Sequence, residues 1–334
     1  MNNLSQPARW VPVLILLGLA AVPALATAFD DNFLVAFFAR VLIYAIAASA
    51  LNIALGFGGL VSLGHALFIG VGMYSVSLPA FHGVSAGFIH LLICVVLCAS
   101  IGAVTGLISL RTSGIAFIMI TLAFAQMGYF VIVSLKQYGG DDGMSIATAS
   151  QLFGWALDTP KAVFYTAWVL LVALTYWVDR LRVSPFGMTL RAGRQNARRV
   201  MSVGLALRSY QLTAYVLSAV GCGLAGMLLA NLNAYASPSS MSWSVSGELI
   251  VMVVLGGMGS VFGPLLGALA FLGVEEVLKA YTEHWMAVFG LAIVAVPMLG
   301  KAGLVGLLER LNRTRQIPAQ AKPSAAHPHT KEAS

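Results

Sequence analysis

Long apolar runs, separated by short polar segments, follow one another along almost the whole chain. A run of about 18 or more apolar residues with almost no charge is typical of a helix that crosses a bilayer. The runs lie at residues 11–29, 33–55, 60–80, 86–109, 113–135, 161–179, 209–233, 247–280 and 285–300. The pattern predicts an all-α, polytopic membrane helix bundle, with one transmembrane domain over residues 1–312.

The 247–280 run is too long for one simple crossing and contains GGMGSVFGPLLG at 256–267. Glycines and Pro264 interrupt a helix. The run is therefore expected to enter the membrane and return to the same side, as two short crossings or as a re-entrant pair. This gives about ten crossings in total, or eight plus a re-entrant pair.

A weak internal similarity links the two halves of the chain. Two glycine-rich sets of residues, one in each half, align with each other when one gap is allowed. Each set interrupts an apolar run. The sets are Gly58, Gly59, Ser62, Gly64 and His65, and Gly256, Gly257, Ser260, Gly263 and Pro264. Interrupted helices at matching positions indicate the binding site of a transporter and a possible inverted repeat. Chance alignment or close packing of glycine-rich helices explains the similarity equally well.

The two ends of the chain carry their own expectations. The first run follows Arg9 and contains ALATA at 24–28, so it suits a retained first helix or, less well, a cleaved signal peptide. The segment 313–334 is rich in Pro, Ala and Lys, with Ile317 as its one large apolar residue. Such a segment cannot bury a core, which predicts a disordered tail.

Composition excludes a soluble globular domain. Of 334 residues, 59% are hydrophobic and only 9% are charged, against about 25% charged residues in soluble domains. The net charge of +7 comes from basic residues between and after the apolar runs, so it indicates topology and not a nucleic-acid partner. The segment 180–208 holds seven arginines and no acid, which predicts that it is cytoplasmic. If the loops alternate between the two sides of the membrane from this segment outward, both termini are cytoplasmic. Asp142 and Glu283 then lie on the outer side.

The chain carries no motif for catalysis, nucleotide binding or metal binding. It is therefore not expected to hydrolyse ATP or to hold a cofactor. Its three cysteines lie inside apolar runs and are expected to be buried thiols. Polar groups inside spans are functional suspects, and here they are Arg40, Asn52, Thr121, Gln126, Asn231 and Glu248. His65 is expected either to bind substrate or, more simply, to hydrogen-bond between helices.

The stretch RAGRQNARRVMSVG at 191–204 places apolar Val200, Met201 and Val203 beside a basic face. A short cytoplasmic helix of this kind suits docking to a soluble partner. It equally suits a topology signal that lies on anionic lipid.

Five strings in order resemble the LivM-type permease subunit of branched-chain amino acid ABC importers. They are GFGGLVSLGHALFIGVGMY at 56–74, RTSGIAFIMITLAFAQMGYF at 111–130, YGGDDG at 138–143, SPFGMTLRAGRQNARRVMSVG at 184–204 and SGELIVMVVLGGMGSVFGPLLGA at 246–268. The resemblance covers about residues 40–308. It implies a bacterial inner-membrane subunit that pairs with a second permease of the family, binds two cytoplasmic ATPases and receives substrate from a periplasmic binding protein.

The resemblance also implies which residues act. A loop helix that docks the ATPase corresponds to 191–204, within the coupling loop 180–208, and its candidates are Arg191, Arg194, Arg198, Arg199, Met201, Val203 and Gly204. Both acids usual in this loop are replaced, by Gln195 and Ala197, and Leu60 stands where many relatives have Gln. Candidates for the translocation pathway are Ser62, His65, Thr121, Gln126, Gly256, Gly257 and Ser260.

The substrate class and the need for partners stay open at this stage. Branched-chain or other hydrophobic amino acids are the first expectation. Relatives that move urea, short amides or aromatic amino acids provide the alternatives. A stand-alone channel or facilitator for a small neutral solute also suits broken, glycine-rich helices, although it needs no cytoplasmic docking helix.

Overall fold

The computed structural model describes residues 15–16, 18–24, 32–152, 154–281, 284, 287, 290–291 and 303–306. The predicted tail at 313–334 and Glu283 lie outside these residues, as do most of the predicted runs 11–29 and 285–300. Expectations for those segments therefore remain sequence-based predictions.

The described chain is mostly helical. The longer helices are α3 (Asn32–Asn52), α4 (His65–Phe81), α5 (Gly87–Ser109), α6 (Ile115–Ser134), α7 (Pro160–Val183), α10 (Leu207–Asn233), α11 (Trp243–Gly256) and α12 (Gly263–Tyr281). Shorter helical elements are η1 (Ile53–Phe57), η2 (Lys136–Tyr138), α8 (Pro185–Gln195), α9 (Ala197–Ser202) and η3 (Pro238–Met241). The four strands have two residues each: β1 (Met144–Ser145), β2 (Gln151–Leu152), β3 (Trp155–Ala156) and β4 (Tyr235–Ala236).

In the part of the chain that the structure describes, five helices are long and apolar enough to cross a membrane. They are Phe33–Phe57, Gly87–Ser109, Ile115–Ser134, Pro160–Val183 and Leu207–Asn233. The helices His65–Phe81 and Trp243–Gly256 are apolar but shorter. The chain is thus a polytopic helical membrane protein, as its apolar runs predict.

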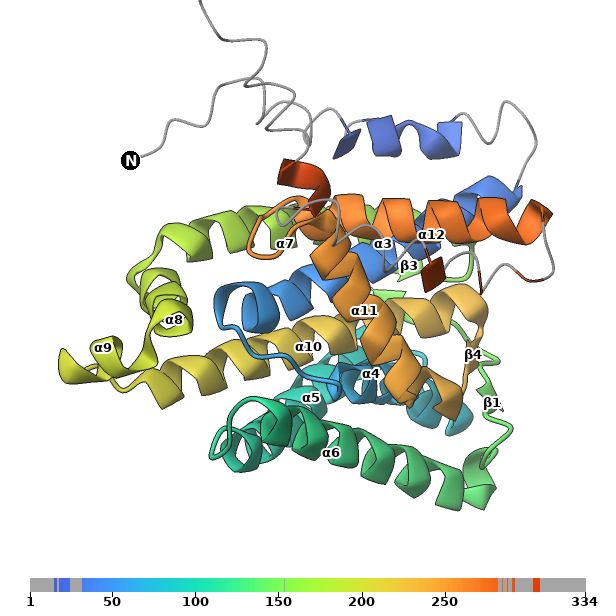
Figure 1. Cartoon of the computed structure of the whole chain (residues 1–334). Coiled ribbons are helices and arrows are strands. Elements are labelled where there is room, and N and C mark those ends of the chain that lie inside the picture. The colour runs from blue at the N-terminus through green and yellow to red at the C-terminus, as the bar shows by residue number, and fades with distance from the viewer. Residues whose placement is uncertain are drawn as a thin grey trace, which may run out of the picture.

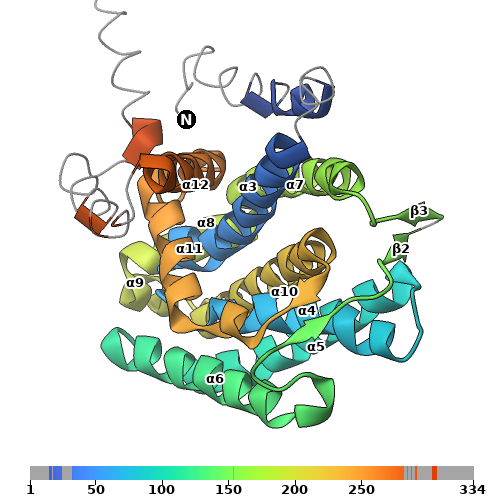
Figure 2. The same cartoon turned by 90° about the vertical axis from the view of Figure 1, so that its right-hand side faces the viewer.

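Helix α10 is the centre of the bundle, where it packs on α3, α4 and α5 (Figures 1 and 2). Small residues allow α4 and α10 to approach closely. A Cβ atom at Gly72 would lie 2.0 Å from the carbonyl oxygen of Gly223, and one at Gly226 would lie 2.0 Å from that of Ile69. Glycines at this contact therefore set the distance between the two helices, as small residues commonly do in membranes.

The two ends of the bundle differ in structure. Helices α8 and α9 form one end, called here the arginine-rich end, and β1 and β4 lie at the opposite end (Figure 1). Strand β1 pairs antiparallel with β4, with Met144 opposite Ala236. The segment before α7 is also fixed there, because the backbone N–H of Ser150 donates to Asn231 Oδ1 at 2.9 Å.

Candidate functional site

Two helices are interrupted at the positions that the sequence predicts. Helix α3 continues into the π-helix η1, the chain is non-helical from 58 to 64, and α4 begins at His65. Helix α11 ends at Gly256, and α12 begins at Gly263. Gly59 has φ +69° in the first break, and Gly257 has φ +119° in the second. Only glycine adopts such backbone angles readily, which explains why both breaks are glycine-rich.

Helix α11 is shorter than a helix that crosses a bilayer. Its 14 residues span about 21 Å at 1.5 Å per residue, against about 30 Å for the hydrocarbon core of a bilayer. Figure 1 shows α11 running steeply across the direction of α10 and α12. Helix α11 is therefore too short to cross the hydrocarbon core by itself.

The two breaks lie against each other, and Asn52 joins them. The Asn52 Nδ2 group donates to the carbonyl oxygen of Ser260 at 2.8 Å. The backbone N–H of Gly259 donates to Asn52 Oδ1 at 2.9 Å. The side chain is 1% exposed. A Cβ atom at Gly56 would lie 2.7 Å from the Gly259 nitrogen, so the two backbones are in direct contact.

A second hydrogen bond also connects the two broken helices, from the start of α4 to α11. The backbone N–H of Ala66, in the first turn of α4, donates to Ser246 Oγ of α11 at 2.9 Å. This N–H has no partner within its own helix, because the first four amides of a helix lack one. Each broken helix thus supplies a polar group to the other break.

The predicted pathway residues fall into two groups. Ser62 and Thr121 meet at Gly64, where a Cβ atom would lie 3.4 Å from Ser62 Oγ and 3.2 Å from Thr121 Cβ. Gly256, Gly257 and Ser260 form the second break, where Ser260 Oγ donates to the Gly257 carbonyl at 2.7 Å.

His65 lies between α4 and α10 and is fully buried. Its Nε2 atom is 2.9 Å from Ser218 Oγ, and its ring packs edge-on against Phe68 and Tyr215. This contact matches the interhelical hydrogen bond that the sequence leaves open for His65. Gln126 is half-buried in α6, apart from either group.

The segment 191–204 is not one helix. Helix α8 ends at Gln195 and α9 starts at Ala197, because Asn196 is extended, with φ −153°, and its Oδ1 accepts the Arg199 N–H at 3.0 Å. Asparagine favours this N-cap geometry over a helix interior. The expectation of a single docking helix is therefore wrong at this point.

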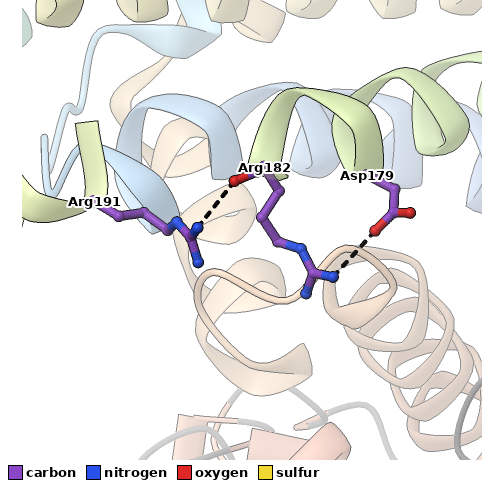
Figure 3. A network of polar contacts seen from close by, with 3 residues as sticks. All are labelled: Asp179, Arg182 and Arg191. Carbon is purple, nitrogen blue, oxygen red and sulfur yellow. Dashed lines mark hydrogen bonds and ion pairs between the residues drawn. The ribbon is translucent and has the colours of Figure 1, made fainter. Parts of the chain in front are cut away.

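The coupling-loop arginines point in different directions. Arg191 Nη2 donates to the Arg182 carbonyl at the end of α7 at 2.9 Å, and Arg182 in turn pairs with Asp179 at 3.2 Å (Figure 3). Arg191 therefore joins α8 to α7. Arg198 and Arg199 are exposed on α9.

Arg194 is an exposed residue of α8 that contacts the first break. Its Nη1 group donates to the Gly56 carbonyl in the first break. A Cβ atom at Gly59 would lie 2.9 Å from Arg194 Cγ, and one at Gly259 would lie 3.7 Å from Arg194 Nη1. The side chain thus contacts the first break and lies beside the second.

The end of the segment is exposed. Met201 is 53% exposed and Val203 is 75% exposed. Gly204 has φ +86°, and no atom lies within 4 Å of a Cβ built there. Gly204 is therefore required for a turn and not for a close approach within this chain.

An open pocket of about 610 Å³ lies at the arginine-rich end. It lies between the first break, the start of α6 and the coupling loop, with Met258 of the second break in its wall. Its wall combines apolar and basic side chains, among them Leu60, Phe117, Met258, Arg111, Arg194 and Arg208. The volume is that of a small-molecule site.

Sequence reasoning missed the two residues that join the breaks. The sequence marks Asn52 as a polar suspect inside a span, but neither Asn52 nor Ser246 is among the candidate pathway residues. The available signal for Asn52 is its position, four residues before Gly56 at a helix interruption. In the described part of the chain, no group of three His, Cys, Asp or Glu residues gathers to hold a metal ion.

Two broken helices that contact each other in a polytopic bundle, beside an open pocket, are typical of a membrane transporter. Residues 33–297 match the family described as branched-chain amino acid transport system / permease component. The chain belongs to this family, and it is therefore a transport component and not an enzyme.

Several curated proteins are similar to the chain. The high-affinity branched-chain amino acid transport system permease protein LivM of Escherichia coli (strain K12) is 30% identical over 79% of this chain and 68% of its own length. The probable LivM of Methanocaldococcus jannaschii is 27% identical over 72% of this chain and 79% of its own length. LivH of Salmonella typhimurium is 27% identical over 49% of this chain and 53% of its own length. No solved structure matches.

Proposed function

We propose that the chain is one of two permease subunits of an ATP-driven importer, and that it moves branched-chain or other hydrophobic amino acids by alternating access. The observation that carries this proposal is the contact of Arg194 with the first break. A partner that shifts α8 acts directly on an interrupted helix. A self-sufficient channel has no need of this connection.

The proposed importer includes two ATPases and a periplasmic binding protein as partners of this chain. Two ATPases dock on the cytoplasmic segment 191–204 through Arg194, Arg198, Arg199, Met201 and Val203, with Gly204 forming the turn. Arg191 supports the segment from α7. A periplasmic binding protein delivers substrate at the end formed by β1 and β4.

The second permease belongs to the same family, since relatives of both the LivM and LivH kinds are similar to this chain. Helix α6 suits a position toward that subunit. Only 17% of its span is buried, against 67% for α10.

The pathway runs past both breaks to the pocket at the arginine-rich end. Ser62, Thr121 and Ser260 supply hydroxyls near it, and Gly256 and Gly257 let the second break change shape. His65 and Gln126 remain candidates of lower rank, because His65 is engaged with Ser218 and Gln126 lies apart. A wall that combines apolar and basic side chains suits a small amino acid, which carries an aliphatic side chain and a carboxylate.

The location and domain organisation are part of the proposal. The arginine-rich end faces the cytoplasm of a bacterium by the positive-inside rule, and the protein crosses the inner membrane about ten times. Arg111 and Arg194 line the same pocket, as expected if both loops lie on one side. The transmembrane domain spans 1–312, and the tail 313–334 is cytoplasmic.

Purification of the complex tests the proposal. The chain carries an affinity tag and is expressed from its native locus. The complex is then extracted from the membrane in mild detergent. A second permease and two ATPases should co-purify in stoichiometric amounts. A tagged chain that is monomeric, and that nevertheless catalyses facilitated flux of urea or an amide, would instead support a stand-alone facilitator.

A further inference from the structure

We infer that Asn52 is a positioning residue for transport: it holds the two helix breaks together so that Arg194 moves both when α8 moves. This inference rests on the proposed function, because it concerns how a docked ATPase would act on the pathway. It assigns to one buried side chain the two hydrogen bonds that hold the first break, which Arg194 contacts, to the second break.

Asn52 uses both ends of its amide on the second break. Its Nδ2 group donates to Ser260 O at 2.8 Å, and its Oδ1 accepts from Gly259 N at 2.9 Å. These partners lie 208 and 207 residues away along the chain. At 1% exposure, the amide has no water to replace these partners, so separating the breaks leaves buried polar groups unpaired.

Where the two breaks touch, a side chain larger than that of glycine is disfavoured on either of them. A Cβ atom at Gly56 would lie 1.9 Å from Asn52 Oδ1. Gly259 has φ +79°, which disfavours other residues. The contact therefore fixes the two backbones at one distance.

The hydrogen bond of Arg194 goes to the first break, and its side chain only lies beside the second. Its Nη1 group donates to Gly56 O, whereas no hydrogen bond from Arg194 to the second break is present among the described residues. A displacement of α8 reaches the first break through Arg194. It reaches the second break through the contact between the two breaks, which the two hydrogen bonds of Asn52 hold together.

A matched control exists at the opposite end of the bundle. Asn231 is also a buried asparagine, 7% exposed, with both amide ends engaged. Its Oδ1 accepts from Ser150 N at 2.9 Å, and its Nδ2 donates to Met227 O at 2.8 Å. Truncation of Asn231 removes the same number of amide hydrogen bonds, one of them within its own helix, without touching either break.

The experiment uses the whole complex, purified through a tag on this chain and reconstituted in liposomes with its binding protein. Asn52→Ala and Asn231→Ala are compared with wild type for complex yield, melting temperature, ATP hydrolysis and leucine taken up per ATP. We expect Asn52→Ala to keep its ATPase subunits and to hydrolyse ATP, while uptake per ATP falls at least about tenfold. Asn231→Ala should lose stability to a similar extent and keep the wild-type ratio.

A distance measurement separates coupling from general damage. Spin labels are placed at Val61 and Met258, which are exposed beside the first and second breaks, in a background without the native cysteines. Wild type should give one narrow distance with and without ATP, and Asn52→Ala should give a broad distribution.

Two results would overturn the inference. One is an Asn52→Ala complex with the wild-type ratio of uptake to ATP and an unchanged distance distribution. The other is an equal loss of that ratio in Asn231→Ala. If no ATPase co-purifies with the wild-type chain, the proposed function itself fails, and the two failures are distinguishable.

Discussion

Removing the apolar side chain of Met201 tests how the coupling segment binds an ATPase. Met201 projects from α9 and is 53% exposed. Complete burial of a methionine side chain contributes about 1.5–3 kcal/mol, and roughly half of this area remains available for a partner. Met201→Ala should therefore weaken docking by about 1 kcal/mol, which is about fivefold in Kd. An exposed charge such as Arg198 contributes about 1 kcal/mol or less to a pair, and salt screens it.

The assay is titration of a fluorescent ATPase subunit onto nanodiscs that hold this chain and its permease partner, at low and high salt. Met127→Ala is the matched control, since Met127 is 61% exposed but lies in the membrane-spanning part of α6. Met201→Ala should weaken binding equally at both salt concentrations, and Met127→Ala should not. The reasoning is refuted if Arg198→Ala has the larger effect and high salt abolishes binding, because docking would then be electrostatic.

Three further predictions concern packing, the loop turn and topology. Gly226→Ala forces a Cβ atom to within 2.0 Å of a carbonyl of α4, so it should lower stability by about 1–3 kcal/mol, seen as a lower melting temperature; a Gly247→Ala control, where a Cβ meets nothing, should not. Gly204→Leu strains a residue with φ +86° and should reduce uptake more than Met201→Ala does, whereas Gly204→Asn should be milder, because asparagine tolerates this conformation. Single cysteines at Asp142 and Arg198 should react with an impermeant thiol reagent from outside and from inside, respectively; labelling of both from one side would contradict the topology.

The helical, polytopic class of the fold could be predicted because apolar run length is a direct physical signal. The interruption after Gly256 was predictable for the same kind of reason, since a run of glycines followed by Pro264 cannot continue as a helix. The break between α8 and α9 was missed, because Asn196 caps a helix through a local side-chain bond that the amphipathic pattern of 191–204 hides.

The site could be predicted only in part, because its decisive contacts join residues distant in sequence. The alignment of the two glycine-rich sets indicated where the breaks lie. Nothing in it showed that Asn52 bonds Gly259, or that Arg194 reaches Gly56, since these contacts depend on how α3, α8 and α11 pack. The direction in which Arg191 turns, back to Arg182 of α7 (Figure 3), was equally invisible in the run of arginines.

Uptake of leucine into liposomes tests the central claim most directly. The account predicts that this chain alone supports neither concentrative uptake nor ATP hydrolysis. Addition of the second permease, the two ATPases, the binding protein and ATP should give uptake against a gradient. Sustained concentrative uptake by the chain alone would contradict the account.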